Sequence, residues 1–259
     1  MSVEELCQAC GMASSTMRKK LAKMEGEGLL IRTHGGALSI DSKRDDPIDK
    51  KIFLNVPQKK AIALAAISFI KKGDVVAVAG GSTTGWMSSY KHHFDHTIVY
   101  TDSITFATSL TQQENNKVEV HINGGIVRGR TGCIIGTDEE EVFNNVHFDK
   151  AFIGCEGFSL EKGAGSENIL VGKVERAMAL QATEIFILCD STKLKKDTLY
   201  TVIEADRVTK LITDDEANPY YIDILRDHGI DVLVTSVKQP SGMLRDLGLD
   251  SPRQKKYPV

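Results

Sequence analysis

The first forty residues constrain the fold most, because they follow the pattern of a helix, a turn and a second helix. The first helix is predicted from apolar residues at the spacing i, i+3, i+4 and i+7, namely Val3, Leu6, Cys7 and Cys10. We expect Gly11 to end it, and Ser14 or Ser15 to cap the next helix. The apolar stripe of that second helix is Met17, Leu21 and Met24. This order is typical of a helix-turn-helix unit that binds DNA.

The second predicted helix is basic. Residues 14–24 contain four basic side chains and no acidic one: Arg18, Lys19, Lys20 and Lys23. Such a run is usually only a solvated face. A hairpin with a glycine turn is predicted directly after it, at residues 29–40, and Arg32 and His34 lie on this hairpin. A hairpin directly after a basic helix is called a wing in DNA-binding proteins. Its presence favours the interpretation that the basic helix contacts DNA phosphates over the interpretation that it is only a solvated face.

The pattern changes after residue 40. Residues 41–57 are charged and poor in apolar residues, so we predict a linker there. Strands then alternate with helices from residue 58 to residue 240, which predicts an α/β domain with a mainly parallel sheet. The expected strands are 75–79, 97–100, 118–122, 151–155, 185–188, 208–213 and 232–235. The other expected segments are helices at 59–72, 169–182 and 220–227, a glycine-rich loop at 154–165 and a polar tail at 241–259.

The composition is that of an ordinary globular protein, with 41% hydrophobic and 26% charged residues among 259. We find no signal peptide, and no apolar run approaches the roughly 20 residues of a membrane span. The five cysteines, an odd number, fit free thiols in a reducing compartment. We therefore predict a cytoplasmic protein without membrane contact.

No metal or cofactor is predicted. Cys7 and Cys10 have the spacing of zinc ligands, but no second pair of cysteines is spaced to complete a site. They share the apolar face of the first helix, so we interpret them as small core residues.

Small polar residues follow several predicted strands, at the edge where open α/β sheets bind ligands. Gly80–Thr84 places glycines and hydroxyl groups between a strand and a helix. Backbone N–H groups and hydroxyls in this position form an anion cradle, and phosphate is the usual occupant. The segment is neither a Walker A loop nor a dinucleotide fingerprint. Taken alone, it fits a tight turn with a hydroxyl cap equally well.

Three further clusters follow other strands. Thr101–Ser103 repeats the hydroxyl-rich turn after the next strand, and also fits an ordinary N-cap. Gly124 and Gly125 fit a turn. Asp190–Lys193 adds a lysine that suits a phosphate as a point charge, or is simply solvated. The combination favours a small phosphorylated ligand more strongly than any one cluster does.

These residues resemble the DeoR family of bacterial transcriptional regulators over nearly the whole chain. The predicted wing, Gly28–Ala37, is the most specific match, and Ser14–Leu21 resembles the recognition helix of the family. The segments that resemble its effector domain are Gly73–Thr84, Thr101–Ser103, Gly124–Gly125, Asp149–Gly157 and Asp190–Lys193. The resemblance implies an effector domain similar in fold to ribose-5-phosphate isomerase and glucosamine-6-phosphate deaminase. It also implies that this domain senses sugar phosphates or related metabolites, and that binding usually weakens the hold on the operator.

The resemblance assigns roles by position. The residues facing DNA would be Ser15, Thr16, Arg18, Lys19 and Lys20, with Arg32 and His34 on the wing. The phosphate loop would be Gly81, Ser82, Thr83 and Thr84. The rest of the effector site would be Thr101, Asp102, Ser103, Gly124, Gly125 and Lys193.

The chain departs from the family pattern in three respects. The first helix of the family's DNA-binding domain is absent before Met1, so we expect a truncated module whose second helix loses part of its cover. Lys20 stands where aspartate is usual. Ala79 replaces a common aspartate and Asp102 a common asparagine, and this pair bears on the choice of effector.

We predict a repressor of carbohydrate metabolism genes rather than an enzyme. It would bind operator DNA as a homo-oligomer, a dimer or a tetramer, under the control of a phosphorylated sugar. Two alternatives stay open. The first is a phosphosugar isomerase or deaminase that uses Asp102 and Asp149 as acid–base groups, although Asp149 fits a structural cap equally well. The second is an effector sensor that has lost DNA binding and acts through hetero-oligomers.

Overall fold

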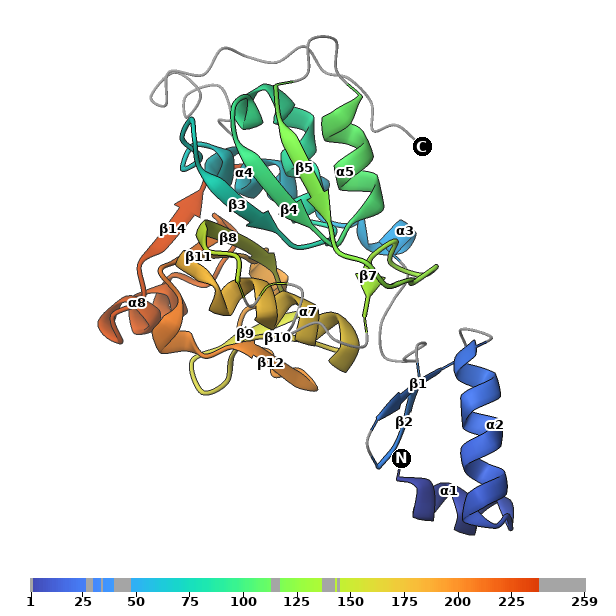
Figure 1. The fold of residues 1–259 in the computed structure, drawn as a ribbon. Coiled ribbons are helices and arrows are strands. Elements are labelled where there is room, and N and C mark those ends of the chain that lie inside the picture. Colours follow the sequence, from blue (N-terminus) through green and yellow to red (C-terminus); the bar gives the residue numbers. More distant parts are fainter. Residues whose placement is uncertain are drawn as a thin grey trace. The chain divides into compact units, whose positions relative to one another are not determined.

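A computed structural model describes residues 2–26, 30–33, 35–39, 48–112, 117–136, 143 and 145–237. The chain forms two compact units, Met1–Asp45 and Asp46–Val259, and each is described by itself (Figure 1). His34 of the predicted wing, residues 41–47 of the predicted linker and the predicted tail 241–259 lie outside the described residues.

Helix α1 (Val3–Cys10) opens the N-terminal unit, where the apolar spacing predicts a helix. The Ser2 hydroxyl accepts a hydrogen bond from Glu5 N, and the Glu5 carboxylate accepts one from Ser2 N. This capping box satisfies backbone donors that would otherwise lack partners at the helix start. Gly11, with a φ of 61°, ends the helix in the left-handed conformation that favours glycine.

Helix α2 (Ser14–Gly26) is followed by an antiparallel hairpin of β1 (Leu30–Thr33) and β2 (Gly36–Ser39). The small core of the N-terminal unit consists of Met17, Leu21 and Leu30. The side chains packed against this core are Val3, Leu6, Cys7, Met12 and Ala37. Met24 and Cys10 are exposed, although the sequence pattern puts both on apolar faces. The core is therefore shorter than the predicted stripes.

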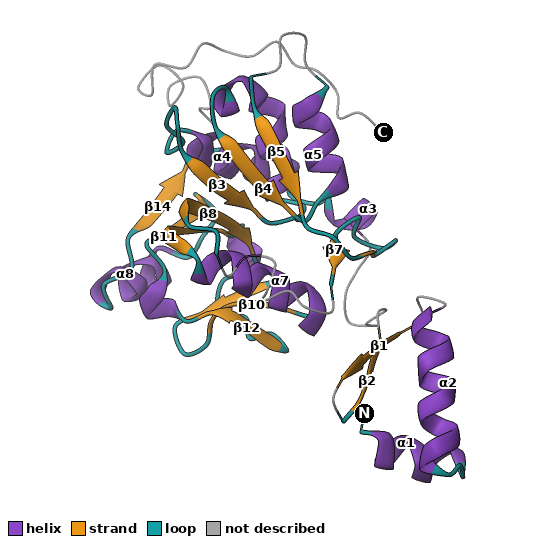
Figure 2. Ribbon diagram, in the orientation of Figure 1, coloured by secondary structure: helices purple, strands orange, loops and turns teal. Residues whose placement is uncertain are grey.

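A seven-stranded parallel sheet forms the centre of the second unit (Figure 2). Its strands run in the order β14-β13-β11-β8-β3-β4-β5. They are β3 (Val75–Val78), β4 (Ile98–Thr101), β5 (Glu119–Ile122), β8 (Phe148–Gly154), β11 (Ala182–Leu188), β13 (Lys210–Asp214) and β14 (Val232–Thr235). The chain runs outward from β3 to β5 on one side and from β8 to β14 on the other. The order thus reverses between β3 and β8, where such sheets bind ligands at the carboxyl ends of their strands.

Helices lie on both faces of this sheet. They are α4 (Val56–Ile67), the 3-10 helix η1 (Thr84–Phe94), α5 (Ile104–Thr111), α7 (Ile169–Leu180) and α8 (Pro219–Asp227). The short helix α3 (Ile48–Lys51) precedes α4 in the chain. Figure 1 shows α4 and α5 on one side of the sheet and α7 and α8 on the other. Ile62 and Ile67 of α4 pack with Val76, Phe152 and other buried apolar residues in the larger core. Strands covered on both faces explain why their sequences are continuous apolar runs.

The glycine-rich segment 154–165, predicted as a loop, contains two strands instead. β9 (Gly157–Ser159) and β10 (Gly163–Ser166) form an antiparallel sheet with β12 (Tyr200–Ile203). A side chain at Gly163, where φ is 73°, or at Gly165 would collide with the backbone of β12. Gly165 is thus needed for close strand packing, and Gly163 both for close packing and for its left-handed backbone conformation.

Several predicted boundaries are also wrong. α4 ends at Ile67 rather than at residue 72, and Ala182 begins β11 instead of ending the preceding helix. Residues 48–57, predicted as linker, contain α3 and the start of α4. A short hairpin of β6 (Ile126–Val127) and β7 (Ile134–Ile135) follows Gly125. Among the described helices, none is long and apolar enough to cross a membrane.

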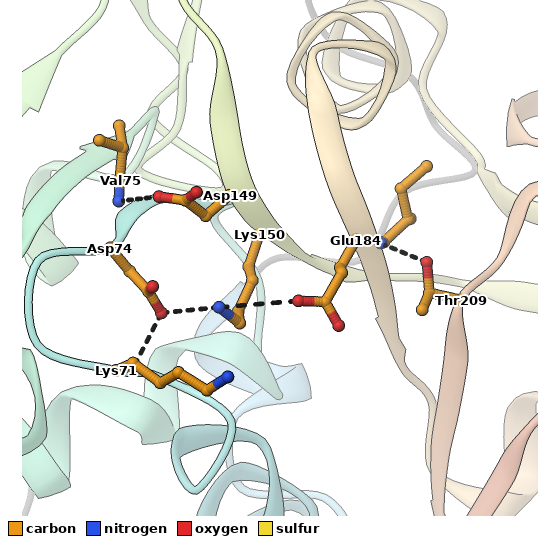
Figure 3. Close-up of polar contacts among 8 residues, drawn as sticks. Lys71, Asp74, Val75, Asp149, Lys150, Glu184 and Thr209 are labelled. Carbon is orange, nitrogen blue, oxygen red and sulfur yellow. Dashed lines mark hydrogen bonds and ion pairs between the residues drawn. The ribbon is translucent and has the colours of Figure 1, made fainter.

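A buried ion pair joins the strands at the amino edge of the sheet (Figure 3). Lys150 Nζ lies 2.7 Å from Asp74 Oδ2 and 3.7 Å from Glu184 Oε1. The same Asp74 oxygen accepts a hydrogen bond from Lys71 N at 2.7 Å. Asp149 Oδ2 accepts one from the first residue of β3 at 2.8 Å. These groups tie the starts of β3, β8 and β11 together.

Replacing Lys150 should destabilise the second unit strongly. Lys150→Met leaves the Asp74 carboxylate buried without its cation, and we expect a loss of about 3 to 5 kcal/mol. Urea unfolding followed by the fluorescence of Trp86 measures this unit, since the sequence contains one tryptophan. Lys162→Met is the matched control: its pair with Asp197 is more than half exposed, so its loss should be below about 1 kcal/mol. Equal losses in both variants would contradict this account.

Candidate functional site

The loops after β3, β4, β8 and β11 meet at the carboxyl edge of the large sheet, because these strands are parallel neighbours. Gly80 N donates a hydrogen bond to Asp102 Oδ1 at 2.5 Å, which joins the first two loops. A Cβ atom at Gly80 would lie 2.5 Å from Cys133 Sγ and 3.1 Å from Ser103 Cβ. Glycine at this position therefore allows the two loops to pack directly against each other.

The predicted phosphate loop lies between β3 and η1. Gly81 and Ser82 are half-buried, whereas Thr83 and Thr84 are buried. Gly85 N donates to Gly81 O at 2.9 Å, which closes the turn. Thr84 Oγ1 is buried without a hydrogen-bond partner among the described residues. A buried hydroxyl without a partner carries a desolvation cost that a ligand can relieve, which makes Thr84 a candidate ligand-binding residue.

The segment Thr101–Ser103 is buried and partly occupied by its own hydrogen bonds. Thr101 Oγ1 accepts from Ser103 N at 3.1 Å, and Ser103 Oγ accepts from Phe106 N at 3.3 Å. The Ser103 hydroxyl thus caps α5, which is the ordinary role that the sequence also allows. Asp102 Oδ2 has no hydrogen-bond partner among the described residues, although the Cys133 thiol is nearby.

Two carboxyl groups at this edge are poorly solvated. Burial raises the pKa of Asp102 to about 6, while its hydrogen bond from Gly80 opposes the shift. Burial also raises the pKa of Glu175 well above its ordinary value, and the charges of Asp102 and Glu156 raise it further. Glu175 was missed from the sequence because a glutamate within a helix is usually solvated. Its charged neighbours come from the loops after β4 and β8, which places it at the same edge.

Three lysines border the other part of this edge. Lys51 of α3 forms an ion pair with Glu156, and Lys59 Nζ donates to Lys51 O. Burial lowers the pKa of Lys59 to about 8; Asp190 opposes this shift, whereas Lys193 and Lys51 add to it. Lys193 is half-buried at the end of the 3-10 helix η2 (Ser191–Lys193). Of these three lysines, the sequence predicted only Lys193 as an effector-site residue. Lys51 lay in the predicted linker, and Lys59 lay in a predicted helix.

Gly124 and Gly125 lie beside the β6–β7 hairpin. Gly125 has a φ of 143°, and a side chain there would collide with Ile135 O. Gly124 is exposed, with no atom within 4 Å of a Cβ built on it. β7 is in turn bonded to the main chain of Asp102, since Ile134 N donates to Asp102 O at 2.7 Å. The structure therefore gives Gly125 a packing role next to the site.

In the N-terminal unit, α2 presents a hydrophilic face. Met17 and Leu21 are buried, and the residues exposed around them are Ser15, Thr16, Arg18, Lys19, Lys20 and Lys23. Arg32 is exposed on β1, and His34 lies outside the described residues. The apolar anchors thus fix which side of α2 faces outward, and that side carries the predicted DNA-binding residues.

The carboxylate pair of the enzyme alternative is separated by the sheet. Asp102 follows the carboxyl end of β4, whereas Asp149 accepts a hydrogen bond at the amino end of β3. The two groups lie at opposite edges, so they do not form one acid–base site. The interpretation of Asp149 as a structural residue is the correct one.

The two units are those of a regulator that joins a helix-turn-helix unit to an α/β sensor unit. Residues 54–215 match the DeoR C terminal sensor domain, and residues 1–43 match the DeoR-like helix-turn-helix domain. The chain belongs to the DeoR family of transcriptional regulators, which confirms the resemblance.

Relatives match nearly end to end. The HTH-type transcriptional repressor GlcR of Bacillus subtilis is 29% identical over 236 residues, which cover 91% of this chain and 90% of that protein. The HTH-type transcriptional regulator GlpR of Haloferax volcanii is 30% identical over 215 residues, covering 82% and 83%. Among solved structures, the full-length sorbitol operon regulator SorC from Klebsiella pneumoniae is 12% identical, with a TM-score of 0.36 and 94% of each chain covered.

The buried Asp102 should make the stability of the second unit fall as pH rises. Its folded pKa, about 6, lies above the value of 3.8 for a free side chain, so the folded state holds the extra proton between these values. Asp102→Asn keeps the oxygen that accepts from Gly80 N and removes the titration. Relative to wild type, the variant should gain about 2 to 3 kcal/mol between pH 4 and pH 7.

Urea unfolding at several pH values, followed by Trp86 fluorescence, measures this difference. Asp227→Asn, at an exposed position, is the control and should show a difference that barely changes with pH. A pH-independent difference for Asp102→Asn as well would contradict the burial of an ionisable Asp102.

Proposed function

We propose that this chain is a cytoplasmic repressor of carbohydrate metabolism genes whose hold on operator DNA is changed by a phosphorylated sugar. The observation that carries the proposal is the buried Thr84 hydroxyl, which has no hydrogen-bond partner in the described part of the chain. It lies in a glycine-containing loop at the sheet edge where Lys51, Lys59 and Lys193 gather. Membership of the DeoR family and the exposed basic face of α2 support its DNA-binding part.

The ligand part rests on the chemistry of the carboxyl edge. Gly81–Thr84 supplies backbone N–H groups and hydroxyls, which suit phosphate oxygens. Burial, with a smaller contribution from Lys193 and Lys51, lowers the pKa of Lys59, and the negative charge of Asp190 only partly offsets this effect. A phosphate dianion supplies further negative charge. Asp102 and Glu175 provide carboxyl groups that suit the hydroxyls of a sugar.

The DNA part rests on the N-terminal unit. With Met17 and Leu21 buried, Arg18, Lys19 and Lys20 face outward and present positive charge to a phosphate backbone. We propose a homo-oligomer, because two such units would read half-sites separated by one helical turn or a multiple of it. A ligand that changes the spacing of the two units would then change affinity for the operator.

DNA binding by this chain should depend on salt and on α2. Arg18→Ala and Lys19→Ala should each weaken binding, because each removes a cation that pairs with a DNA phosphate. Each substitution should also reduce the slope of log affinity against log salt by about 1. Gel-shift titrations with in vitro selected DNA measure this. Lys72→Ala, an equal loss of charge at an exposed position of the second unit, should leave the slope unchanged. Ligand binding with no sequence-selective DNA binding would favour the sensor that acts through other proteins.

Sugar phosphates should stabilise the second unit, and a ligand at 100 times its dissociation constant adds about 2.7 kcal/mol. Thr84→Val should abolish most of this gain without destabilising the free protein, because the hydroxyl that it removes is buried and unpartnered among the described residues. Lys193→Ala should also reduce it, and Thr108→Val, at an exposed position, is the control. A thermal-shift screen measures these effects. Shifts with nucleotides and none with phosphosugars would overturn the proposal.

A further inference from the structure

Lys51 ends α3, the first described element of the second unit, and its side chain reaches the carboxyl edge. Its ammonium group pairs with the carboxylate of Glu156, in the loop after β8. The two side chains are 19% and 21% exposed, so a ligand at this edge has access to the pair. The other Glu156 oxygen accepts a hydrogen bond from Glu167 N at 2.5 Å, which holds this carboxylate in place independently of Lys51.

The backbone of α3 has two further contacts with the loops of this edge. Ile48 N donates to Arg130 O at 2.9 Å, in the turn between β6 and β7. Lys59 Nζ donates to Lys51 O. Because β7 is itself bonded to the main chain of Asp102, α3 is connected with the loops after both β4 and β8.

The charge of Lys51 acts on both the lysines and the carboxyl groups of this edge. Its charge lowers the pKa of Lys59, and it also opposes the large upward shift in the pKa of Glu175. A phosphate dianion entering between these groups carries twice the charge of the Glu156 carboxylate. It therefore competes with Glu156 for the same ammonium group, while Glu156 keeps its bond from Glu167 N.

We propose that Lys51 is a ligand-binding residue of the sensor site, and that its transfer from Glu156 to the phosphate of the ligand repositions α3. This inference rests on the proposed function, since it names the residue through which that site is read. α3 is the element of the second unit that follows residues 40–47, and these residues continue from the wing strand β2. In this proposal α3 is the described element of the second unit that lies nearest in sequence to the DNA-binding unit.

The exchange of Lys51 between Glu156 and the phosphate makes the affinity for the ligand differ between the two states of the site. A ligand shifts an equilibrium only by its differential affinity for the two states. In one of the two proposed states Lys51 pairs with Glu156, and in the other it pairs with the phosphate of the ligand. A static surface ion pair would instead contribute little to either state, typically below about 1 kcal/mol.

Three variants of the full chain separate the exchange from a static pair. Lys51→Met removes the ammonium group and keeps the length of the side chain. Glu156→Gln keeps an oxygen for Glu167 N and removes the charge that competes for Lys51. Lys50→Met removes the exposed neighbouring lysine of the same helix and is the control. Binding of hexose 1-phosphates, hexose 6-phosphates and inorganic phosphate is measured by calorimetry, and binding of in vitro selected DNA by fluorescence anisotropy with and without them.

We expect opposite effects from the two pair variants. Lys51→Met should lower the affinity for the sugar phosphate by about tenfold or more, and should abolish its effect on DNA binding. Glu156→Gln should raise the affinity for the sugar phosphate, because the competing carboxylate is gone. Without ligand, it should also shift DNA affinity in the direction that the ligand produces in wild type. Lys50→Met should behave as wild type.

Two results would overturn the inference while leaving the proposed function intact. The first is wild-type ligand binding and coupling in Lys51→Met. The second is an equal loss of ligand affinity in Lys51→Met and Glu156→Gln, which indicates a merely structural pair. If the wild-type chain binds no sugar phosphate at all, the proposed function fails and the inference fails with it.

Discussion

Parallel pairing fixes the direction of all seven strands in the large sheet, and this constraint brings loops from distant parts of the chain to one edge. The loops after β3, β4, β8 and β11 are far apart in sequence, yet their strands are neighbours. The hydrogen bond from Gly80 N to the buried Asp102 then locks the first two loops together, and it leaves no room for a side chain at Gly80. Chemistry at this edge is therefore shared among several short segments, none of which is a site by itself. The opposite edge has a different character, because there Lys150 and Asp74 neutralise each other.

The charged and polar groups of the two edges differ in how completely they are partnered within the protein. At the amino edge, Lys150 Nζ lies 2.7 Å from the carboxylate of Asp74 and 3.7 Å from that of Glu184. The backbone N–H of Lys71 donates a further hydrogen bond to Asp74. At the carboxyl edge, oxygens of Asp102, Glu175 and Thr84 are buried without partners among the described residues. Unpartnered buried polar groups cost free energy, and the presence of several at this edge supports the proposal that a ligand binds here. The same comparison explains why Asp149, whose carboxylate is used by the backbone of β3, is not an acid–base group.

Much of this architecture could be predicted from the sequence, and the failures have physical causes. The apolar runs indicated the strands of the parallel sheet, because a strand covered on both faces has no polar alternation. The strands β9 and β10 were missed because their glycines, required by close packing, look like a loop. Thr84 and Asp102 were predicted as site residues because they follow strands, and the structure places both at the carboxyl edge. Lys51, Glu156 and Glu175 were not predicted as site residues. Their sequence contexts, a charged segment, a glycine-rich loop and a helix, are also those of ordinary solvated lysines and glutamates. Only tertiary packing shows that they face one another.

In the proposed mechanism, the buried Lys59 links ligand binding to the position of α3. The pKa of Lys59 is lowered to about 8 chiefly by burial, and the nearby Lys51 and Lys193 lower it further against the effect of Asp190. In the proposed mechanism, an added anion compensates for the burial of Lys59 and for the positive charges of Lys51 and Lys193. We therefore expect the ligand to bind most tightly when the three lysines stay close together. That requirement restricts where α3 can lie, since the Lys59 ammonium group is bonded to the carbonyl of Lys51. Allosteric coupling typically amounts to 1–3 kcal/mol, about the magnitude of one charge-assisted hydrogen bond. We therefore expect the proposed coupling to require a rearrangement of only these few side chains and α3, with the sheet unchanged.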